Sequence, residues 1–151
     1  MLFYFLAFVI VAIDQSLKYL VHQSMRLGQS IPLIDGILKL TYVRNTGAAF
    51  SLFIGFSPYL AVIGFLVVIA VIFFHYKIPL HLRVLQIGLA FVLGGSLGNL
   101  IDRVFRTYVI DYLDITIWPV FNFADIMINV GVILIVFKLF AEEEEDVSDS
   151  V

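Results

Sequence analysis

The sequence predicts an all-α membrane protein in which four transmembrane helices carry a small β element outside the membrane. Of its 151 residues, 62% are hydrophobic and only 14% are charged, whereas soluble domains average roughly 45–50% apolar and about 25% charged residues. A chain this short keeps much of its surface in contact with solvent, so it cannot hide the excess in its interior. Lipid is the solvent that tolerates such a surface, because in water the exposed apolar patches would aggregate.

Four segments are long and apolar enough to cross a bilayer, whose ~30 Å hydrocarbon core needs about 20 helical residues. We expect the spans at residues 2–21, 58–74, 84–101 and 120–140. The first has no basic residue before Lys18 and no small-residue cleavage site, which favours a retained span over a signal peptide. Residues 1–141 are then a single membrane-embedded domain.

A period of two distinguishes the segment between the first two spans. Asp35-Gly36 is a tight-turn sequence, and apolar and polar side chains alternate after it. The alternating residues are Leu38, Lys39, Leu40, Thr41, Tyr42 and Val43. This pattern predicts a β element within residues 31–51, and a second extended piece is expected at residues 108–112.

Composition also excludes several kinds of chemistry. The chain has no cysteine and only three histidines, which are scattered, so disulfides, thiolate catalysis and a histidine-based metal site are not expected. Five of the twelve acidic residues lie in the run from Glu142 to Asp146. We expect residues 142–151 to be a disordered acidic tail, and this tail argues against nucleic acid as a partner.

Four crossings place both termini on one side of the membrane. A literal count of basic residues would put the termini outside, because cytoplasmic loops normally carry the excess of Lys and Arg. The terminus side holds Lys77, Arg83 and Lys138, and the other side holds Lys18, Arg26, Lys39, Arg44, Arg103 and Arg106. We give this count little weight, since several residues of the second group are expected to have specific partners.

Charged residues within the spans are the informative ones, because an ionisable group at the membrane centre costs at least ~2.5–3.5 kcal/mol. Asp14 precedes Lys18 by one helical turn, in the order that favours an ion pair. The favoured interpretation of this pair is a structural anchor, with substrate contact as the alternative.

Asp125 has no oppositely charged neighbour in its own helix, and its nearest later polar group is Asn129. Asp111 lies fourteen residues earlier and near the same membrane face. A short re-entering loop could bring the two together, and adjacent carboxylates share one proton because both cannot readily ionise. Such a pair supplies the base and the acid that peptide hydrolysis requires. The alternatives are a packing role for Asp125 and an ordinary loop position for Asp111.

The string Gly94-Gly95-Ser96-Leu97-Gly98 fits the G-x-S-x-G pattern of serine hydrolases. That motif requires a strand-turn-helix elbow with a histidine nearby, whereas here it lies within an apolar span. Small-residue helix packing is the better interpretation.

Five blocks, in order along nearly the whole chain, resemble the lipoprotein signal peptidases, also called signal peptidase II, of bacterial inner membranes. The blocks are Asp14-Gln15 with Lys18; Arg44-Asn45-Thr46-Gly47-Ala48-Ala49-Phe50; Gly94-Gly95-Ser96-Leu97-Gly98-Asn99-Leu100-Ile101-Asp102-Arg103; Val109-Ile110-Asp111-Tyr112; and Phe121-Asn122-Phe123-Ala124-Asp125. Two positions differ from the usual family pattern, with Ile126 in place of a small residue and Tyr112 in place of phenylalanine. Neither difference removes a group that handles protons.

The resemblance implies an aspartyl endopeptidase with Asp111 and Asp125 as its catalytic pair. It also implies a substrate site formed by Asn45, Gly47, Asn99, Arg103 and Asn122, with Asp14, Lys18, Asp102 and Asn129 in supporting positions. The implied substrates are lipid-modified prolipoprotein signal peptides, cut before a cysteine that carries a diacylglyceryl group. A monomer in contact with membrane lipid is expected, without metal or cofactor, with cytoplasmic termini and an active site near the outer face.

The competing hypothesis is a small proton-coupled transporter or channel subunit that uses the same carboxylates as a relay. Four spans without an evident inverted repeat argue mildly against it. A polar path through the bundle to the opposite face would favour transport.

Overall fold

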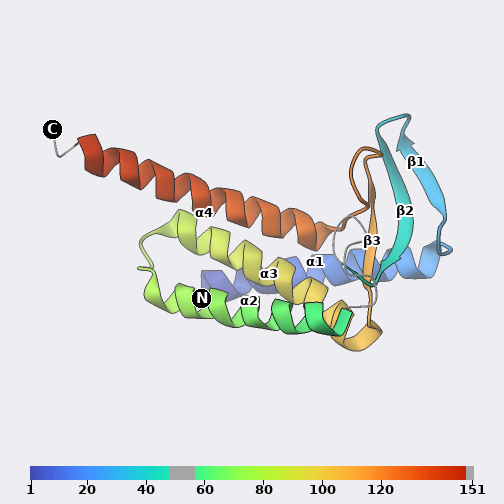
Figure 1. Ribbon diagram of the computed structural model, residues 1–151, viewed down its shortest axis with the longest axis horizontal. Coiled ribbons are helices and arrows are strands. Elements are labelled where there is room, and N and C mark those ends of the chain that lie inside the picture. Colours follow the sequence, from blue (N-terminus) through green and yellow to red (C-terminus); the bar gives the residue numbers. More distant parts are fainter. Residues whose placement is uncertain (48–56, 149–151) are drawn as a thin grey trace.

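The computed structural model describes residues 1–47 and 57–148, which form a helical bundle with a small sheet at one end (Figure 1). The elements are α1 (Leu2–Ser24), β1 (Ser30–Ile34), β2 (Leu38–Asn45), α2 (Ser57–Lys77), α3 (Arg83–Arg106), β3 (Val109–Asp114) and α4 (Phe123–Ser148). Both termini lie at the end of the bundle opposite the sheet, as four crossings require (Figure 1). The predicted fold class is confirmed.

All four helices are long and apolar enough to cross a membrane. α4 begins at Phe123, later than the expected residue 120, because Asn122 caps the helix from outside it. The expectation of a disordered tail from residue 142 was wrong for its first part. The structure continues α4 through Ser148, and residues 149–151 lie outside the described residues.

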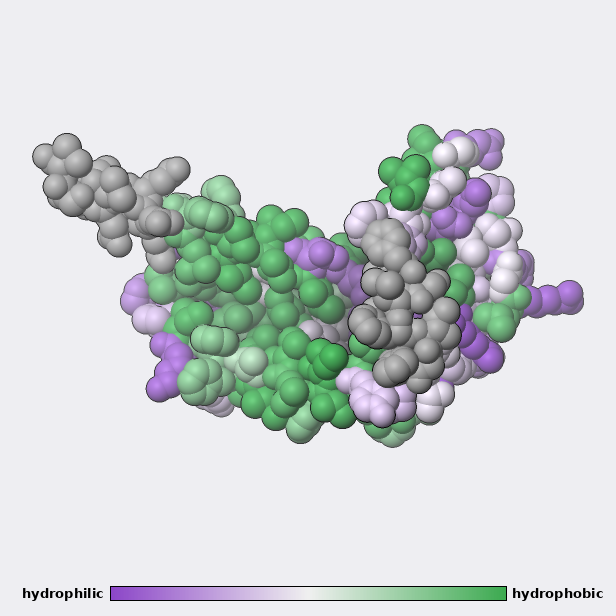
Figure 2. All heavy atoms as spheres, in the orientation of Figure 1, coloured by the Kyte–Doolittle hydropathy of each residue, from purple (hydrophilic) through white to green (hydrophobic). Residues whose placement is uncertain are grey.

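Helix α3 is the central element of the bundle. In the apolar 18-residue stretch that could cross the membrane, 67% of the residues of α3 are buried. The corresponding shares are 28% for α1, 17% for α2 and 11% for α4. The other helices therefore turn most of their large apolar side chains outward, and this surface is nearly continuous along the bundle (Figure 2). Lipid is the environment in which such a surface is stable.

Glycines allow the neighbours of α3 to approach its backbone closely. A Cβ atom on Gly94 would lie 2.7 Å from Cβ of Ile10 in α1, and one on Gly98 would lie 2.5 Å from Oδ2 of Asp14. On the α4 side, a Cβ atom on Gly95 would lie 2.7 Å from Cγ1 of Ile128. The G-x-S-x-G string is thus a helix-packing surface, as predicted.

The sheet is antiparallel, in the order β1-β2-β3. Gly36, at φ +73°, forms the predicted turn between β1 and β2. A buried cluster fixes the sheet to the end of α1, and His22 of α1 also contacts the Tyr42 hydroxyl at 2.7 Å. The cluster consists of Val21, Met25, Tyr42, Ile110 and Tyr112. Both predicted β segments are confirmed, except that residues 48–51 of the first lie outside the described residues.

A reversal after β3 returns the chain to the bundle. The backbone N–H groups of Tyr112 and Leu113 donate to the Phe121 carbonyl at 3.0 and 2.8 Å, and Phe121 N–H donates to the Leu113 carbonyl at 3.0 Å. This folds the loop of residues 115–121 back along β3, so that α4 begins beside the strand that carries Asp111.

The glycine contacts predict an asymmetry between two Gly→Ala variants. In Gly98→Ala the new methyl group would meet Asp14, which is fixed in a buried ion pair, so we expect a loss of about 1–3 kcal/mol in the free energy of unfolding. Gly64→Ala is the control, because its Cβ would lie 3.7 Å from Cδ1 of Leu100, an ordinary contact. Thermal unfolding in detergent measures both, and equal melting temperatures would contradict the packing argument.

Candidate active site

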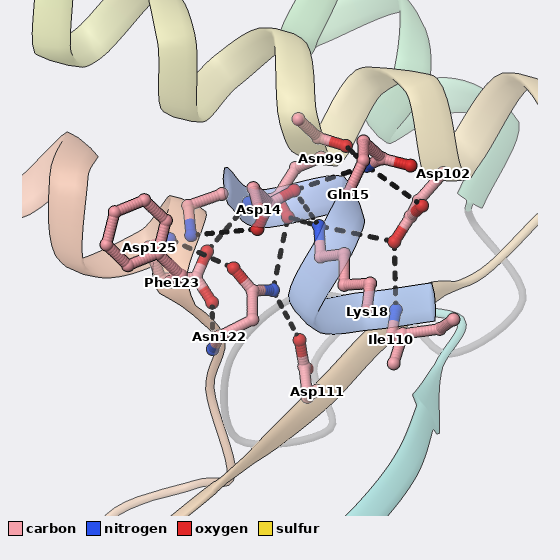
Figure 3. A network of polar contacts seen from close by, with 12 residues as sticks. Asp14, Gln15, Lys18, Asn99, Asp102, Ile110, Asp111, Asn122, Phe123 and Asp125 are labelled. Atoms are coloured by element: carbon pink, nitrogen blue, oxygen red, sulfur yellow. Dashed lines mark hydrogen bonds and ion pairs between the residues drawn. The ribbon is translucent and has the colours of Figure 1, made fainter. Parts of the chain in front are cut away.

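Asp111 and Asp125 approach each other where β3 meets the start of α4 (Figure 3). Asp111 is the third residue of β3 and is 2% exposed. Asp125 lies in the first turn of α4, the end of a helix at which acidic side chains are favourably placed. The re-entering loop thus brings together two carboxylates that are fourteen residues apart.

Asn122 connects the two carboxylates and caps α4. Its Nδ2 donates to Oδ1 of Asp111 at 2.6 Å, and its backbone N–H donates to Oδ2 of Asp125 at 3.1 Å. In return, Asp125 N–H donates to Oδ1 of Asn122 at 3.0 Å. This reciprocal pair is a capping box, with Asn at the N-cap and the carboxylate three residues later. One side chain therefore sets the positions of both acids.

Two further asparagines complete the donors around the acids. Nδ2 of Asn45, in β2, donates to Oδ2 of Asp111 at 2.8 Å, and Nδ2 of Asn99, in α3, donates to Oδ1 of Asp125 at 2.7 Å. Every carboxylate oxygen of the pair thus accepts at least one hydrogen bond. Because these donors are neutral, they orient the acids without neutralising them.

A buried ionic cluster lies behind this site (Figure 3). Nζ of Lys18 is 2.8 Å from Oδ2 of Asp14 and 3.2 Å from Oδ2 of Asp102, and all three side chains are fully buried. Nζ of Lys18 also donates to Oδ1 of Asn99 at 3.0 Å. Since a lysine can only donate, it fixes the carbonyl of Asn99 toward itself and directs the amide of Asn99 to Asp125.

The same cluster holds the elements of the site together. Asp14 accepts the Ala124 N–H at the start of α4, and Asp102 accepts the Ile110 N–H next to Asp111, each at 3.1 Å. Arg106 forms an ion pair with Asp102 one helical turn away. α1, α3, β3 and α4 are therefore all connected through groups that lie behind the two acids.

A pocket of about 640 Å³ opens beside the carboxylates. Its polar lining includes Asn45, Asn99, Arg103, Asp111, Asp125 and Asn129, and its apolar lining comes from the loop of residues 115–121 and from α4. Nε of Arg103 is buried and has no hydrogen-bond partner among the described residues. Pockets of this volume hold small ligands or short peptide segments.

Burial raises the pKa of Asp111 to about 7, and the nearby charge of Asp125 adds to the increase. The hydrogen bonds from Asn45 and Asn122, and the charge of Lys18, act in the opposite direction but are weaker. A carboxyl group with this pKa can hold a proton near neutral pH and can also release it.

The structure divides the residues expected at the substrate site into two groups. Asn45, Asn99 and Arg103 line the pocket with both aspartates, whereas Asn122 and Gly47 are not among the lining residues. Asn122 is fully buried behind the acids, and Gly47 donates its N–H to Oδ1 of Asn45 at 3.0 Å. Among the supporting residues, Asp14, Lys18 and Asp102 form the buried cluster, and Asn129 lines the pocket.

The sequence reasoning missed Arg106, Gln15 and the loop of residues 115–121. The ion pair of Arg106 could have been predicted, because Arg106 follows Asp102 by four residues on the same helix. Gln15, which donates to the Gly98 carbonyl at 3.0 Å, stood in the first family block but was given no role, and the loop had no signal in the sequence. Among the described residues, no three carboxylate or imidazole side chains converge as metal ligands would.

Comparisons with known proteins agree with this geometry. The model of the family described as signal peptidase (SPase) II matches residues 6–141. The chain belongs to the signal peptidase II family. It is 38% identical over 141 residues to the lipoprotein signal peptidase of Halothermothrix orenii, covering 93% of this chain and 97% of that relative. It is 40% identical over 149 residues to that of Halalkalibacterium halodurans, covering 96% of each chain.

Two solved bacterial membrane enzymes share the fold of this signal peptidase II family member. The structure at 2.3 Å resolution superposes with a TM-score of 0.88 at 32% identity, over 93% of this chain and 88% of that chain. The structure at 1.9 Å resolution gives 0.80 at 34% identity, over 89% and 90%. The chain is therefore a membrane-embedded peptidase.

The capping box allows the two roles of Asn122 to be separated. Asn122→Ala removes the N-cap acceptor, so we expect it to lower the free energy of unfolding by about 1 kcal/mol. Asn122→Ser keeps a hydroxyl acceptor for the Asp125 N–H and should unfold within a few tenths of a kcal/mol of the parent. Both variants lose the donor to Asp111, so both should lose peptidase activity. A serine variant with normal activity would show that the bridge to Asp111 is dispensable.

Proposed function

We propose that this protein is an intramembrane aspartyl endopeptidase that removes signal peptides from lipid-modified prolipoproteins, cutting before the lipidated cysteine. The observation that carries the proposal is the pairing of Asp111 and Asp125 in one pocket, both bonded to Asn122. Family membership supports the substrate class, since the relatives named above are lipoprotein signal peptidases.

The environments of the two acids suggest different roles. Asp111, with a pKa of about 7, holds the shared proton, and Asp125, in the first turn of α4, takes the role of the base. Asp125 accepts a proton from water as the water oxygen attacks the scissile carbonyl carbon, and Asp111 gives its proton to the carbonyl oxygen. When the gem-diol intermediate collapses, the C–N bond breaks, Asp125 passes its proton to the nitrogen of the leaving amine, and a hydroxyl of the gem-diol returns a proton to Asp111 as the new carboxyl group forms.

The rest of the pocket suits an extended, apolar peptide. Arg103 offers to a backbone carbonyl its Nε, which has no hydrogen-bond partner among the described residues. Asn129, whose Nδ2 donates to the Asp125 carbonyl at 2.8 Å, offers its amide oxygen as an acceptor. The apolar lining from residues 115–121 and α4 matches a signal peptide in character. One chain supplies all of these groups, so we propose that the monomer is active.

We further propose that the termini are cytoplasmic and that the site lies near the outer face. The charge bias that seemed to oppose this orientation loses most of its weight once partners are assigned. Lys18 belongs to the buried ionic cluster and Arg106 forms an ion pair with Asp102 of that cluster. Arg103 lines the pocket, and Arg44 stacks on Tyr108 with 4.8 Å between Cζ and the ring centre. Four of the six basic residues counted at the sheet end thus have specific partners or line the pocket, so the literal count is a weak guide to orientation.

The transporter hypothesis finds no support in the described residues. Between the site and the terminus end, the interior is filled by an apolar cluster of Phe3, Ala7, Val68, Val71, Leu89, Ala90, Val92 and Leu93. A proton or ion would have to cross this apolar cluster, which is costly in low dielectric.

Removing either acid tests the mechanism. We expect Asp111→Asn and Asp125→Asn to reduce cleavage by at least about 10²-fold, because each removes a proton-transfer group. The matched control is Asp114→Asn, on the same strand as Asp111 but bonded to Thr41 and Thr116 outside the pocket. Conversion of a lipidated precursor is followed by gel shift in folded, membrane-inserted protein. Near-normal cleavage by either of the first two variants would refute the paired-acid mechanism.

The pH dependence of cleavage should be bell-shaped. Since Asp111 must hold a proton in the resting pair, kcat/KM should fall as pH rises through its pKa of about 7. It should also fall in acid, as the second carboxylate becomes protonated. Initial rates in detergent across the pH range measure this. A flat profile on the alkaline side of neutrality would contradict a proton held by Asp111.

A further inference from the structure

Two apolar tips project from the sheet end of the molecule. The β1–β2 hairpin ends in Leu33, Ile34 and Ile37, which are 53%, 52% and 62% exposed, and the loop before α4 carries Ile117 and Trp118, which are 88% and 54% exposed. We call these five residues the apolar lip. The hairpin turn and the loop rise together on the side of the bundle where α4 lies (Figure 1).

Strand register confirms that the two parts of the lip are neighbours. Ile34 pairs with Leu38 at the closed end of the hairpin, and Lys39 pairs with Asp114, the last residue of β3. The loop therefore starts next to the hairpin tip. In the space-filling view, the apolar end of the hairpin stands across a hollow from the apolar surface of α4 (Figure 2).

The length of α4 indicates that the lip lies near the membrane surface. The apolar part of α4, Phe123–Ala141, is 19 residues long, which is ~28 Å of helix against a hydrocarbon core of ~30 Å. Phe123 is therefore near the boundary of the core, and Trp118 comes five residues before it. Trp118 also lines the pocket. The lip therefore lies between the mouth of the pocket and the lipid-facing surface of α4.

The chemistry of the lip suits the interfacial layer better than the hydrocarbon core. Tryptophan concentrates at the headgroup level of membranes. Asp35 lies in the hairpin turn between Ile34 and Ile37, and a carboxylate is costly in hydrocarbon. Directly behind the lip, the side chains of Ser30, Thr41 and Asp114 form a hydrogen-bonded polar row. These polar groups limit how deeply the lip can enter.

We propose that the apolar lip inserts into the interfacial layer of the leaflet at the sheet end and so holds the sheet against the bilayer beside the pocket mouth. The partner is the lipid of the surrounding membrane. This interaction goes beyond the proposed cleavage reaction and does not depend on it, because it can be measured without substrate.

Trp118 is the only tryptophan in the chain, so the unmodified protein carries its own probe. The full-length protein is reconstituted in phosphatidylcholine vesicles with bromine atoms either near the headgroup or near the end of the acyl chain. We expect quenching of Trp118 fluorescence to be several-fold stronger with shallow bromines than with deep ones, and weak with aqueous iodide. Strong iodide quenching without bromolipid quenching would place the loop in water and overturn the proposal, as would stronger quenching by deep bromines.

Substitutions in the apolar lip test whether the tip of the β1–β2 hairpin inserts into the membrane together with Trp118. Ile37→Ser, outside the pocket lining, should shift Trp118 emission to longer wavelength and reduce shallow-bromine quenching. Leu27→Ser is the matched control, because Leu27 is similarly exposed, at 58%, but precedes β1 at the opposite end of the hairpin. Equal effects of the two variants would exclude a specific role for the hairpin tip. Quenching that varies with the protein-to-lipid ratio would instead indicate a second copy of the chain on the lip and overturn the lipid assignment.

Discussion

The site depends on one buried ammonium group. Lys18 has no exposed surface and lies between Asp14 and Asp102, while its remaining donor reaches Asn99. In hydrocarbon, each of these charges alone would be costly, and together they are stable only because the geometry satisfies them all. The arrangement ties α1 to α3, and through backbone N–H groups it also sets the start of α4 and the position of β3. The acids at the pocket are therefore placed by a cluster that never touches the pocket.

The N-terminus of α4 is the second constraint. Its first N–H groups find partners that lie outside regular helix geometry: the Tyr112 hydroxyl, Asp14 and the side chain of Asn122. A helix end within a membrane protein cannot leave these donors unpaired, because there is little water to take their place. One of these capping side chains, Asn122, also bonds to both Asp111 and Asp125, so capping of α4 and positioning of the two acids depend on the same residue.

Much of this could be read from the sequence, for identifiable reasons. The spans followed from hydropathy, the hairpin from a period of two and an Asp-Gly turn, and the Asp14–Lys18 pair from helical spacing. Sequence spacing could not show that Asn122 is buried behind the acids and does not face the pocket. Its position depends on the orientation of its side chain, which caps the start of α4. The extension of α4 through the acidic run was likewise missed, since composition alone does not report whether a polar segment continues a helix.

The glycine contacts of α3 also fix the position of the pocket wall that α4 forms. Gly88 and Gly95 bring α4 against the α3 backbone at two separate crossings, one near Gly131 and one near Ala124, immediately before Asp125. A helix seated at two such points can neither slide nor tilt without breaking backbone packing. Asp125 therefore lies on a pocket wall that is fixed by helix packing, whereas the loop of residues 115–121, which lines the same pocket, has no part in these glycine contacts.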